Sequence, residues 1–282
     1  MSKIVYLDGQ YLPESQARVS VFDRGFLLAD GVYEVVPVLR GRLIDVDPFL
    51  ERLARSLDAL SLEIPISPEA CLKMIRTLIA KNALDEGGVY LQITRGTAPR
   101  QFEFPQGLTP TCMAFTFEKN ILHSPEAAEG VRVVTVEDIR WKRRDIKSIA
   151  LLAQSLAKEE AVRRGAYEGW MVEEGFVTEG TASSAYIVRD GTIITRPLSG
   201  DILPGIRRRV ILELAPRHGI PVEQRPFTPE EAYTADEAFL SSATTLIYPV
   251  TEIDDHSIGN GKPGAITRRL RELYVAAALE EV

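Results

Sequence analysis

The sequence predicts an α+β fold of two domains, in which strands and helices are mixed. Short β-branched runs alternate with amphipathic helical patterns, without the regular βαβ rhythm of a Rossmann sheet. The chain has 282 residues, 45% of them hydrophobic, which is enough to bury one or two cores. A polar stretch at residues 118–130 contains Pro and Gly. We interpret it as a linker between a small N-terminal α/β domain (1–120) and a larger, mostly β C-terminal domain with helices (121–282).

The N-terminal part alternates strand and helix patterns. Strands are expected, between clusters of turn residues, at 4–7, 31–39, 88–94 and 111–117. A helix is expected after Asp47, because Asp is a favoured N-cap and Pro48 suits the first helical position. Leucines then recur at helical spacing. Pro68 opens a second helix, which should reach roughly residue 84.

The C-terminal part holds more strand patterns than helix patterns. Strands are expected at residues 131–136, 168–172, 185–188, 192–195 and 239–242. Helices are expected at residues 148–164, at 206–218 and from 262 onward. Gly165 follows the first of these helices and is a typical C-cap.

Composition argues against several classes of protein. The net charge is −7, whereas a nucleic-acid binder needs a basic face. The short basic runs at 143–144 and 207–209 are interpreted as solvated helix ends. Two isolated cysteines and three scattered histidines form neither a disulfide framework nor a metal site. No apolar run reaches membrane-spanning length, so a soluble cytoplasmic protein is expected.

Lys147 is the lysine with the most unusual surroundings. The chain has eight lysines against 25 arginines, and most of the lysines lie on helix faces or near the termini. Lys147 instead follows a strand and a polar loop, between Ile146 and Ile149. Schiff-base chemistry needs a neutral amine, which apolar surroundings favour. The simpler interpretation of such a lysine is a surface residue whose stem packs on apolar neighbours.

Two turns could bind an anion. No Rossmann or P-loop glycine motif is present. Residues 203–207 place a Pro-Gly turn before a helix, whose first N–H groups attract anions. Residues 241–245 form a hydroxyl-rich loop after a strand. Each alone reads as an ordinary turn. Glu179, expected between strands, would matter if it faced a pyridinium nitrogen.

Several motifs together resemble one family. They occur at residues 20–36, 49–57, 94–100, 136–154, 177–188, 202–208 and 241–245. In order and spacing they are similar to the class IV (fold type IV) aminotransferases, and within these to the enzymes that act on D-amino acids. The resemblance covers about residues 4–275. It implies a transaminase that depends on pyridoxal 5′-phosphate (PLP) and passes an amino group from a D-amino acid to a 2-oxo acid.

The resemblance also implies roles for individual residues. Lys147 matches the lysine that forms the Schiff base, and Glu179 matches the acid that pairs with the pyridine nitrogen. Arg52 matches the arginine that holds the phosphate, together with the backbone of residues 206–207 and 243–244. The cofactor-binding residues expected in this way are Arg52, Lys147, Tyr167, Glu179, Leu203, Ile206, Arg207, Ala243 and Thr244.

Substrate binding is implied at three further residues. Tyr33 and Arg100 match a carboxylate trap, in which the Arg100 loop comes from the partner subunit of a homodimer. An Arg fork suits a carboxylate. Phe102 stands where the D-amino acid enzymes usually have His, so one polar contact is replaced by an apolar surface. Arg207 and Ala243 stand where the family commonly has Thr.

Other functions remain open from the sequence. The Phe102 position also suits an (R)-selective amine transaminase on the same fold. Aminodeoxychorismate lyase shares the cofactor and the fold but carries out a different reaction. A non-enzymatic PLP-carrying or protein-binding module would have no need to retain the lysine, the acid and the phosphate arginine together.

Overall fold

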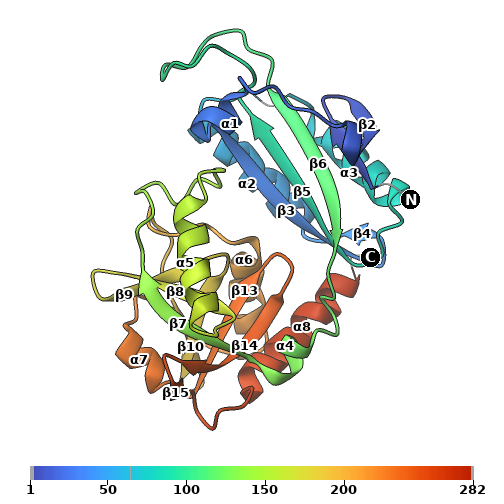
Figure 1. The fold of residues 1–282 in the computed structure, drawn as a ribbon. Coiled ribbons are helices and arrows are strands. Elements are labelled where there is room, and N and C mark those ends of the chain that lie inside the picture. The colour runs from blue at the N-terminus through green and yellow to red at the C-terminus, as the bar shows by residue number, and fades with distance from the viewer. Residues whose placement is uncertain (1–2, 64, 281–282) are drawn as a thin grey trace. The chain divides into compact units, whose positions relative to one another are not determined.

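The computed structural model describes residues 3–63 and 65–280 (Figure 1). The chain forms two compact units. The first contains the described residues up to Asn120 together with Ile146–Ala150. The second contains Ile121–Asp145 and the residues from Leu151 onward. Strands and helices are mixed in both units, which confirms the predicted fold class.

The first unit is built on one antiparallel sheet. Its described strands follow the order β2-β1-β6-β5-β3-β4. In that order they span Gln10–Pro13, Ile4–Leu7, Thr111–Glu118, Gly87–Thr94, Gly31–Leu39 and Arg42–Leu43. The four strands predicted for this region are confirmed to within a residue at each end. The short strands β2 and β4 were not predicted.

Two helices, α2 (Val46–Ala59) and α3 (Pro68–Lys81), pack against this sheet (Figure 1). The prediction of Asp47 as N-cap was wrong, because Asp45 holds that position and Asp47 lies in the first turn. There the Asp47 carboxylate still interacts favourably with the positive end of the helix dipole. Helix α3 starts at Pro68 as predicted but ends at Lys81, three residues before the predicted end. The remaining helical segments are η1 (Glu14–Gln16) and α1 (Arg24–Leu28).

The second unit is built on a larger mixed sheet. Its described strands follow the order β12-β11-β10-β13-β14-β7-β8-β9, and β15 pairs with β14. In that order they span Val222–Gln224, Thr192–Thr195, Ser184–Arg189, Glu237–Ser242, Leu246–Ile253, Val131–Glu137, Glu168–Glu173, Phe176–Gly180 and, for β15, His256–Ser257. The pairs β11–β12, β14–β7 and β7–β8 are parallel. All five predicted strands are confirmed, whereas β9, β12, β14 and β15 were missed.

The helices of the second unit are α4 (Pro125–Glu129), α5 (Leu152–Arg163), α6 (Ile206–Arg217), α7 (Pro229–Tyr233) and α8 (Ala265–Glu280). The helix expected from residue 148 starts only at Leu152, and the one expected from 262 starts at Ala265. The expected linker contains α4. Within the described residues, no helix is long and apolar enough to cross a membrane, and no cluster of three or more His, Cys, Asp or Glu could hold a metal ion.

The two basic runs are not simply solvated, so that prediction was wrong for three of their arginines. Arg144, Arg207 and Arg208 are each only 3% exposed. Arg143 and Arg209 do have exposed side chains. Burying a guanidinium requires partners for its charge and its N–H groups. Arg144 joins an ion network with Asp138 and Glu173, whereas Arg208 donates to the carbonyl of Arg196 and to Oε1 of Gln224.

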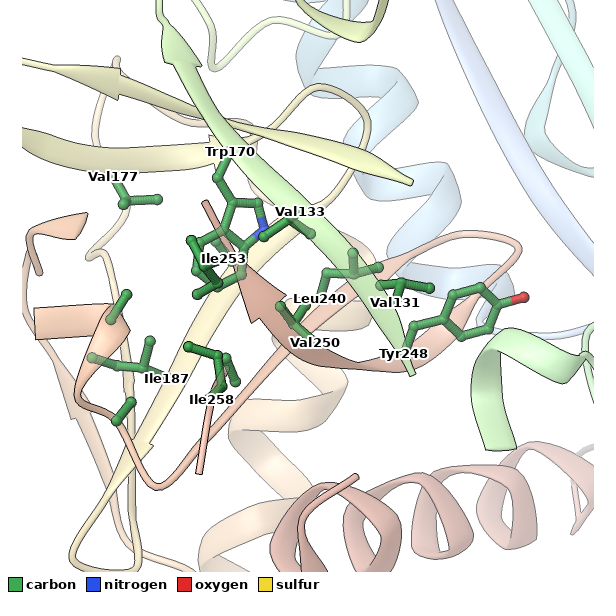
Figure 2. Packing of buried hydrophobic residues seen from close by; sticks show 14 of the residues in the cluster. Val131, Val133, Trp170, Val177, Ile187, Leu240, Tyr248, Val250, Ile253 and Ile258 are labelled. Atoms are coloured by element: carbon green, nitrogen blue, oxygen red, sulfur yellow. The ribbon is translucent and has the colours of Figure 1, made fainter. Parts of the chain in front are cut away.

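A hydrophobic cluster fills one face of the second sheet (Figure 2). It draws residues from β7, β8, β10, β13 and β14. Trp170 of β8 is fully buried there, and its ring centroid lies 6.0 Å from that of Phe227. Truncating a buried Trp costs about 3–5 kcal/mol. This core fixes β8 and, through its pairing, β9, which carries Glu179.

Candidate active site

The backbone around Lys147 extends the sheet of the first unit. The N–H of Tyr33 donates to the carbonyl of Lys147 at 3.0 Å, and the N–H of Ile149 donates to that of Gly31 at 3.1 Å. An antiparallel bridge lies between these two bonds. The opposite edge of β3 pairs with β5 along its length. Pairing with β3 satisfies backbone groups that a helix would otherwise use, and this explains why no helix starts here.

The side chain of Lys147 lies over Tyr33. Its Nζ is 4.0 Å from the centroid of the Tyr33 ring, within the range of a cation–π contact. The backbone N–H of Lys147 donates to Oγ of Ser56 in α2 at 3.3 Å. The structure thus brings together two residues for which the sequence predicted different roles, one with the cofactor and one with the substrate.

Arg52 is held by a buried carboxylate. Its Nε donates to Oε1 of Glu34 at 2.9 Å and one Nη donates to Oε2 at 2.7 Å. Glu34 is completely buried and Arg52 is 8% exposed. Ser56 follows Arg52 by four residues, so both lie on the face of α2 that meets β3. Glu34 was missed, although a charge inside the apolar run of β3 signals a buried partner.

Arg100 and Phe102 lie on an exposed loop of the first unit. Phe102 is 77% exposed, and the Arg100 guanidinium carbon lies 5.5 Å from its ring centroid. The buried Arg24 anchors the loop by donating to the carbonyl of Gln101 at 2.7 Å. Within the described chain, the structure does not join Arg100 or Phe102 to Tyr33. Their predicted substrate contacts stay predictions.

Glu179 lies within β9 of the second unit, not between strands as predicted. Its two carboxylate oxygens accept the N–H of Leu203, at 3.1 and 3.2 Å. Nη1 of Arg140 donates to Oε1 of Glu179. Burial raises the pKa of Glu179 above its ordinary value, while the charge and hydrogen bond of Arg140 oppose that shift. Arg140 was missed, because a single residue in a polar loop carries no periodic signal.

The two predicted anion-binding turns lie close together in the second unit. Gly205 is the N-cap residue of α6, and no side chain of the described residues caps this helix. A Cβ at Gly205 would come within 2.9 Å of Oγ of Ser184. Ser184 pairs with Ser241 across β10 and β13. The turn that contains Ala243 and Thr244 follows β13 directly.

Internal bonds order this second turn. The N–H of Ser242 donates to Oγ1 of Thr245 at 3.1 Å, and Oγ of Ser241 lies 2.9 Å from the hydroxyl of Tyr186. The start of a helix, a glycine without a side chain and neighbouring hydroxyls are features that suit a phosphate. Ile206 is buried at the start of α6. Its location suits a contact through its backbone N–H.

The Arg207 side chain is directed elsewhere. It is 3% exposed, and its guanidinium carbon lies 5.7 Å from the ring centroid of Tyr274 in α8. Position 207 can therefore serve a phosphate through its backbone, while the side chain packs helix against helix. The predicted loss of a Thr hydroxyl at this position does not put a charged side chain in its place.

Tyr167 belongs to the surroundings of the hydrophobic core. It packs against the cluster of Figure 2, with its ring centroid 5.7 Å from that of Tyr248. Nζ of Lys158 lies 4.7 Å from the Tyr167 ring centroid. Burial raises the pKa of the Tyr167 phenol. These contacts explain a packing role, and a role beside the cofactor stays a prediction.

The residue types present fit a phosphorylated pyridine aldehyde. Lys147 offers an amine, Glu179 offers a buried carboxylate for a protonated ring nitrogen, and the start of α6 offers N–H donors for a phosphate. The N–H of Leu203 orients the carboxylate. Each of these groups, taken by itself, is of a type that suits a carbonyl cofactor that reacts with amines.

Comparison with known proteins identifies the class. The model of the family "Amino-transferase class IV" matches residues 31–253. The chain belongs to this family, whose members use PLP.

Individual relatives narrow the comparison. The chain is 39% identical to a D-alanine aminotransferase of Staphylococcus epidermidis over 269 residues, 95% of each chain. It is 36% identical to a D-alanine aminotransferase of Bacillus licheniformis over 279 residues, 98% of each. Among solved structures, it is similar to the branched-chain aminotransferase of the thermophilic archaeon Thermoproteus uzoniensis with norvaline. That match has a TM-score of 0.88 and 28% identity, and covers 99% of this chain and 96% of the other.

Proposed function

We propose that this enzyme transfers the amino group of a D-amino acid, with D-alanine as the first candidate, to a 2-oxo acid. The observation that carries the proposal is the identity of 36–39% to two D-alanine aminotransferases along almost the whole chain. The (R)-amine transaminase and the lyase are not favoured by these relatives. A cytoplasmic location stays a prediction from the sequence.

Lys147 is proposed as the catalytic residue. When bound, PLP accepts electrons from the substrate carbon and carries the amino group between two half-reactions. Lys147 would hold the cofactor through its Nζ, and the same amine, once freed by the substrate amine, would take the proton from the substrate Cα. The antiparallel pairing of its backbone with β3 holds this amine against the Tyr33 ring.

The other cofactor contacts follow from their surroundings. Glu179 would hold the protonated ring nitrogen, and the N–H of Leu203 donates to this carboxylate and directs it. The backbone of Ile206 and Arg207 at the start of α6 and the turn at Ala243 and Thr244 bind the phosphate. We further assign a phosphate contact to Arg52, a residue fixed by its ion pair with Glu34, and a cofactor contact to Tyr167.

We propose that the substrate carboxylate is bound by Tyr33 together with Arg100 of a second copy of the chain. Phe22, Phe26 and Phe102 are 56%, 76% and 77% exposed. The Phe22 carbonyl accepts the N–H of Ala98 at 3.2 Å, so the two segments that carry these rings are neighbours. Contiguous exposed apolar side chains mark an interaction surface. A homodimer through this surface would bury Phe102 next to the substrate.

The decisive experiment is a single-turnover spectrum. Purified protein is loaded with PLP, and D-alanine is added without any oxo acid. We expect the visible band of lysine-bound PLP to disappear and one pyruvate to form per active site, while L-alanine leaves the band unchanged. Loss of the visible band on addition of (R)-1-phenylethylamine but not of D-alanine would instead indicate an amine transaminase. Release of 4-aminobenzoate from aminodeoxychorismate would indicate the lyase.

Oligomeric state is tested separately. Light scattering after gel filtration should give twice the chain mass. The Phe26→Glu variant should give a larger monomer fraction, because it places a charge within the apolar surface. A monomeric wild-type protein with full activity would contradict the proposed origin of Arg100.

A further inference from the structure

Arg140 is the one side chain that the structure bonds directly to the Glu179 carboxylate among the described residues. Both side chains are buried, at 5% and 8% exposed. Nη1 of Arg140 reaches Oε1 of Glu179, and the N–H of Leu203 approaches the same carboxylate. A guanidinium and a peptide dipole therefore meet Glu179 together.

Asp138 fixes the orientation of Arg140. Its two oxygens accept from Nε of Arg140 at 2.9 Å and from Nη2 at 2.7 Å, which is a bidentate pair. Oγ1 of Thr178 donates to the same carboxylate at 2.7 Å. This pair uses Nε–H and one N–H of Nη2, and it fixes the plane of the guanidinium with Nη1 directed at Glu179. The orientation of the Arg140 side chain is therefore fixed by Asp138.

Arg144 completes the charge balance. Its Nη1 lies 3.2 Å from Asp138 and 2.7 Å from Oε2 of Glu173. Arg140 and Asp138 are both among the charges that act on Glu179: the guanidinium of Arg140 contacts it, and the carboxylate of Asp138 lies behind that guanidinium. The positive charge lies closer to Glu179 than the negative one, so these two charges together favour the ionised form, against the burial that raises the pKa of Glu179.

The position of a shared proton depends on this arrangement. A carboxylate and a pyridine nitrogen that share one proton can form a charged pair or a neutral pair. A cation on the far side of the carboxylate favours the charged pair, because its negative end lies next to the cation. Burial alone would favour the neutral pair.

We propose that Arg140, held by Asp138, is a positioning residue that keeps the shared proton on the cofactor ring nitrogen rather than on Glu179. The inference rests on the proposed function, because it requires Glu179 to face that nitrogen. The polar loop between β7 and Lys147 then controls where the shared proton lies, a role that the sequence did not indicate. In this proposal Arg140 acts through its contact with Glu179.

The test reads the ring proton directly. The protein is loaded with PLP labelled with ¹⁵N at the ring, and the ¹⁵N chemical shift reports whether the nitrogen is protonated. We expect a protonated signal in the wild type and in Arg140→Lys, which keeps the charge. We expect Arg140→Gln, which keeps a donor but loses the charge, to shift to the unprotonated signal. A protonated signal in Arg140→Gln would overturn the proposal.

Two further variants keep the result interpretable. If Arg140→Gln does not fold, the double variant Asp138→Asn/Arg140→Gln removes both charges of the pair and should show the same unprotonated signal. A protonated ring there would likewise overturn the inference. Arg225→Gln, which loses an ion pair with Glu231 away from this network, is the matched control and should keep the wild-type shift.

Glu179→Gln separates this inference from the proposed function. Loss of the protonated signal in Glu179→Gln, but not in Arg140→Gln, would leave the role of Glu179 intact and remove only that of Arg140. An unchanged signal in Glu179→Gln would show that Glu179 does not face the ring, and the proposed cofactor contact itself would fail.

Discussion

The two units hold their proposed catalytic groups by different means. Lys147 is fixed through main-chain pairing with β3, which is indifferent to the side chain that the segment carries. Glu179 is fixed largely through charged side chains, in a buried network with Arg140 and Asp138. At Lys147 the side chain that would react is not the group that holds the segment in place. At Glu179 the same buried charges set both the properties of the carboxylate and the stability of the fold. Substitutions in the two places should therefore have different consequences.

The largest effect on chemistry is expected for Lys147→Ala. Loss of the amine would remove the proposed covalent link to PLP and a proton transfer that alone contributes roughly 10²–10⁴-fold to rate. The visible band should vanish, while the melting temperature should stay near that of the wild-type apoprotein, because the β3 bonds use only the backbone. A visible band that persists would show that Lys147 is not the Schiff-base lysine.

The largest effect on stability is expected for Asp138→Asn. Removing one partner of a buried ion pair costs about 3–5 kcal/mol, because the charge left behind stays desolvated. Urea unfolding monitored by circular dichroism measures this loss. Glu159→Gln, which breaks an exposed pair with Arg163 on α5, is the control and should change stability little. Equal effects of the two substitutions would contradict a network that supports the fold.

Acid should remove the same contribution in the wild type. Burial raises the pKa of Asp138, but its bonds to Arg140 and Thr178 and the charge of Arg144 outweigh this and lower it. A lowered folded-state pKa gives stability that is present above the unfolded value of about 4 and is lost as pH falls below it. The stability difference between wild type and Asp138→Asn should therefore shrink below about pH 4. A constant difference between pH 7 and pH 3 would count against this assignment.

The smallest effect is expected for Ser56→Ala. This change removes the hydroxyl that accepts the Lys147 N–H at 3.3 Å, a bond typically worth about 1 kcal/mol. Since the bonds to Tyr33 and Gly31 remain, activity should stay within a few-fold of the wild type. Steady-state kinetics with D-alanine would measure this. A loss comparable to that of Lys147→Ala would show that main-chain pairing alone does not hold the lysine.

Local sequence signals were enough for much of the fold. The β-branched run of β3 and the Pro68 start of α3 both appear as predicted. Strand β14 was missed because Pro249 lies in its middle, and proline normally argues against a central strand. In the structure Pro249 pairs in register with Phe239. The strand at Pro249 depends on pairing with β13, which the residues around Pro249 alone do not indicate.

Sequence predictions for the candidate site came mainly from family motifs. Lys147, Glu179 and the turn before α6 could be named in this way. Arg140 could not, because its role depends on Asp138 and Glu179, which meet only when β9 returns beside β8. The stretch 148–151 was misassigned to a helix for the same reason. Its partner, β3, lies more than a hundred residues earlier in the sequence.

The antiparallel pairing of the Lys147 segment also limits how the length of the chain can change. Side chains alternate between the two faces of an extended strand, so a shift of one residue reverses every one of them. A single insertion or deletion that altered this register would turn Ile146 or Ser148 toward Tyr33 and Lys147 away from it. Loops elsewhere on the molecule can vary in length, but the Lys147 segment has to keep its register against β3 for Lys147 to lie over Tyr33.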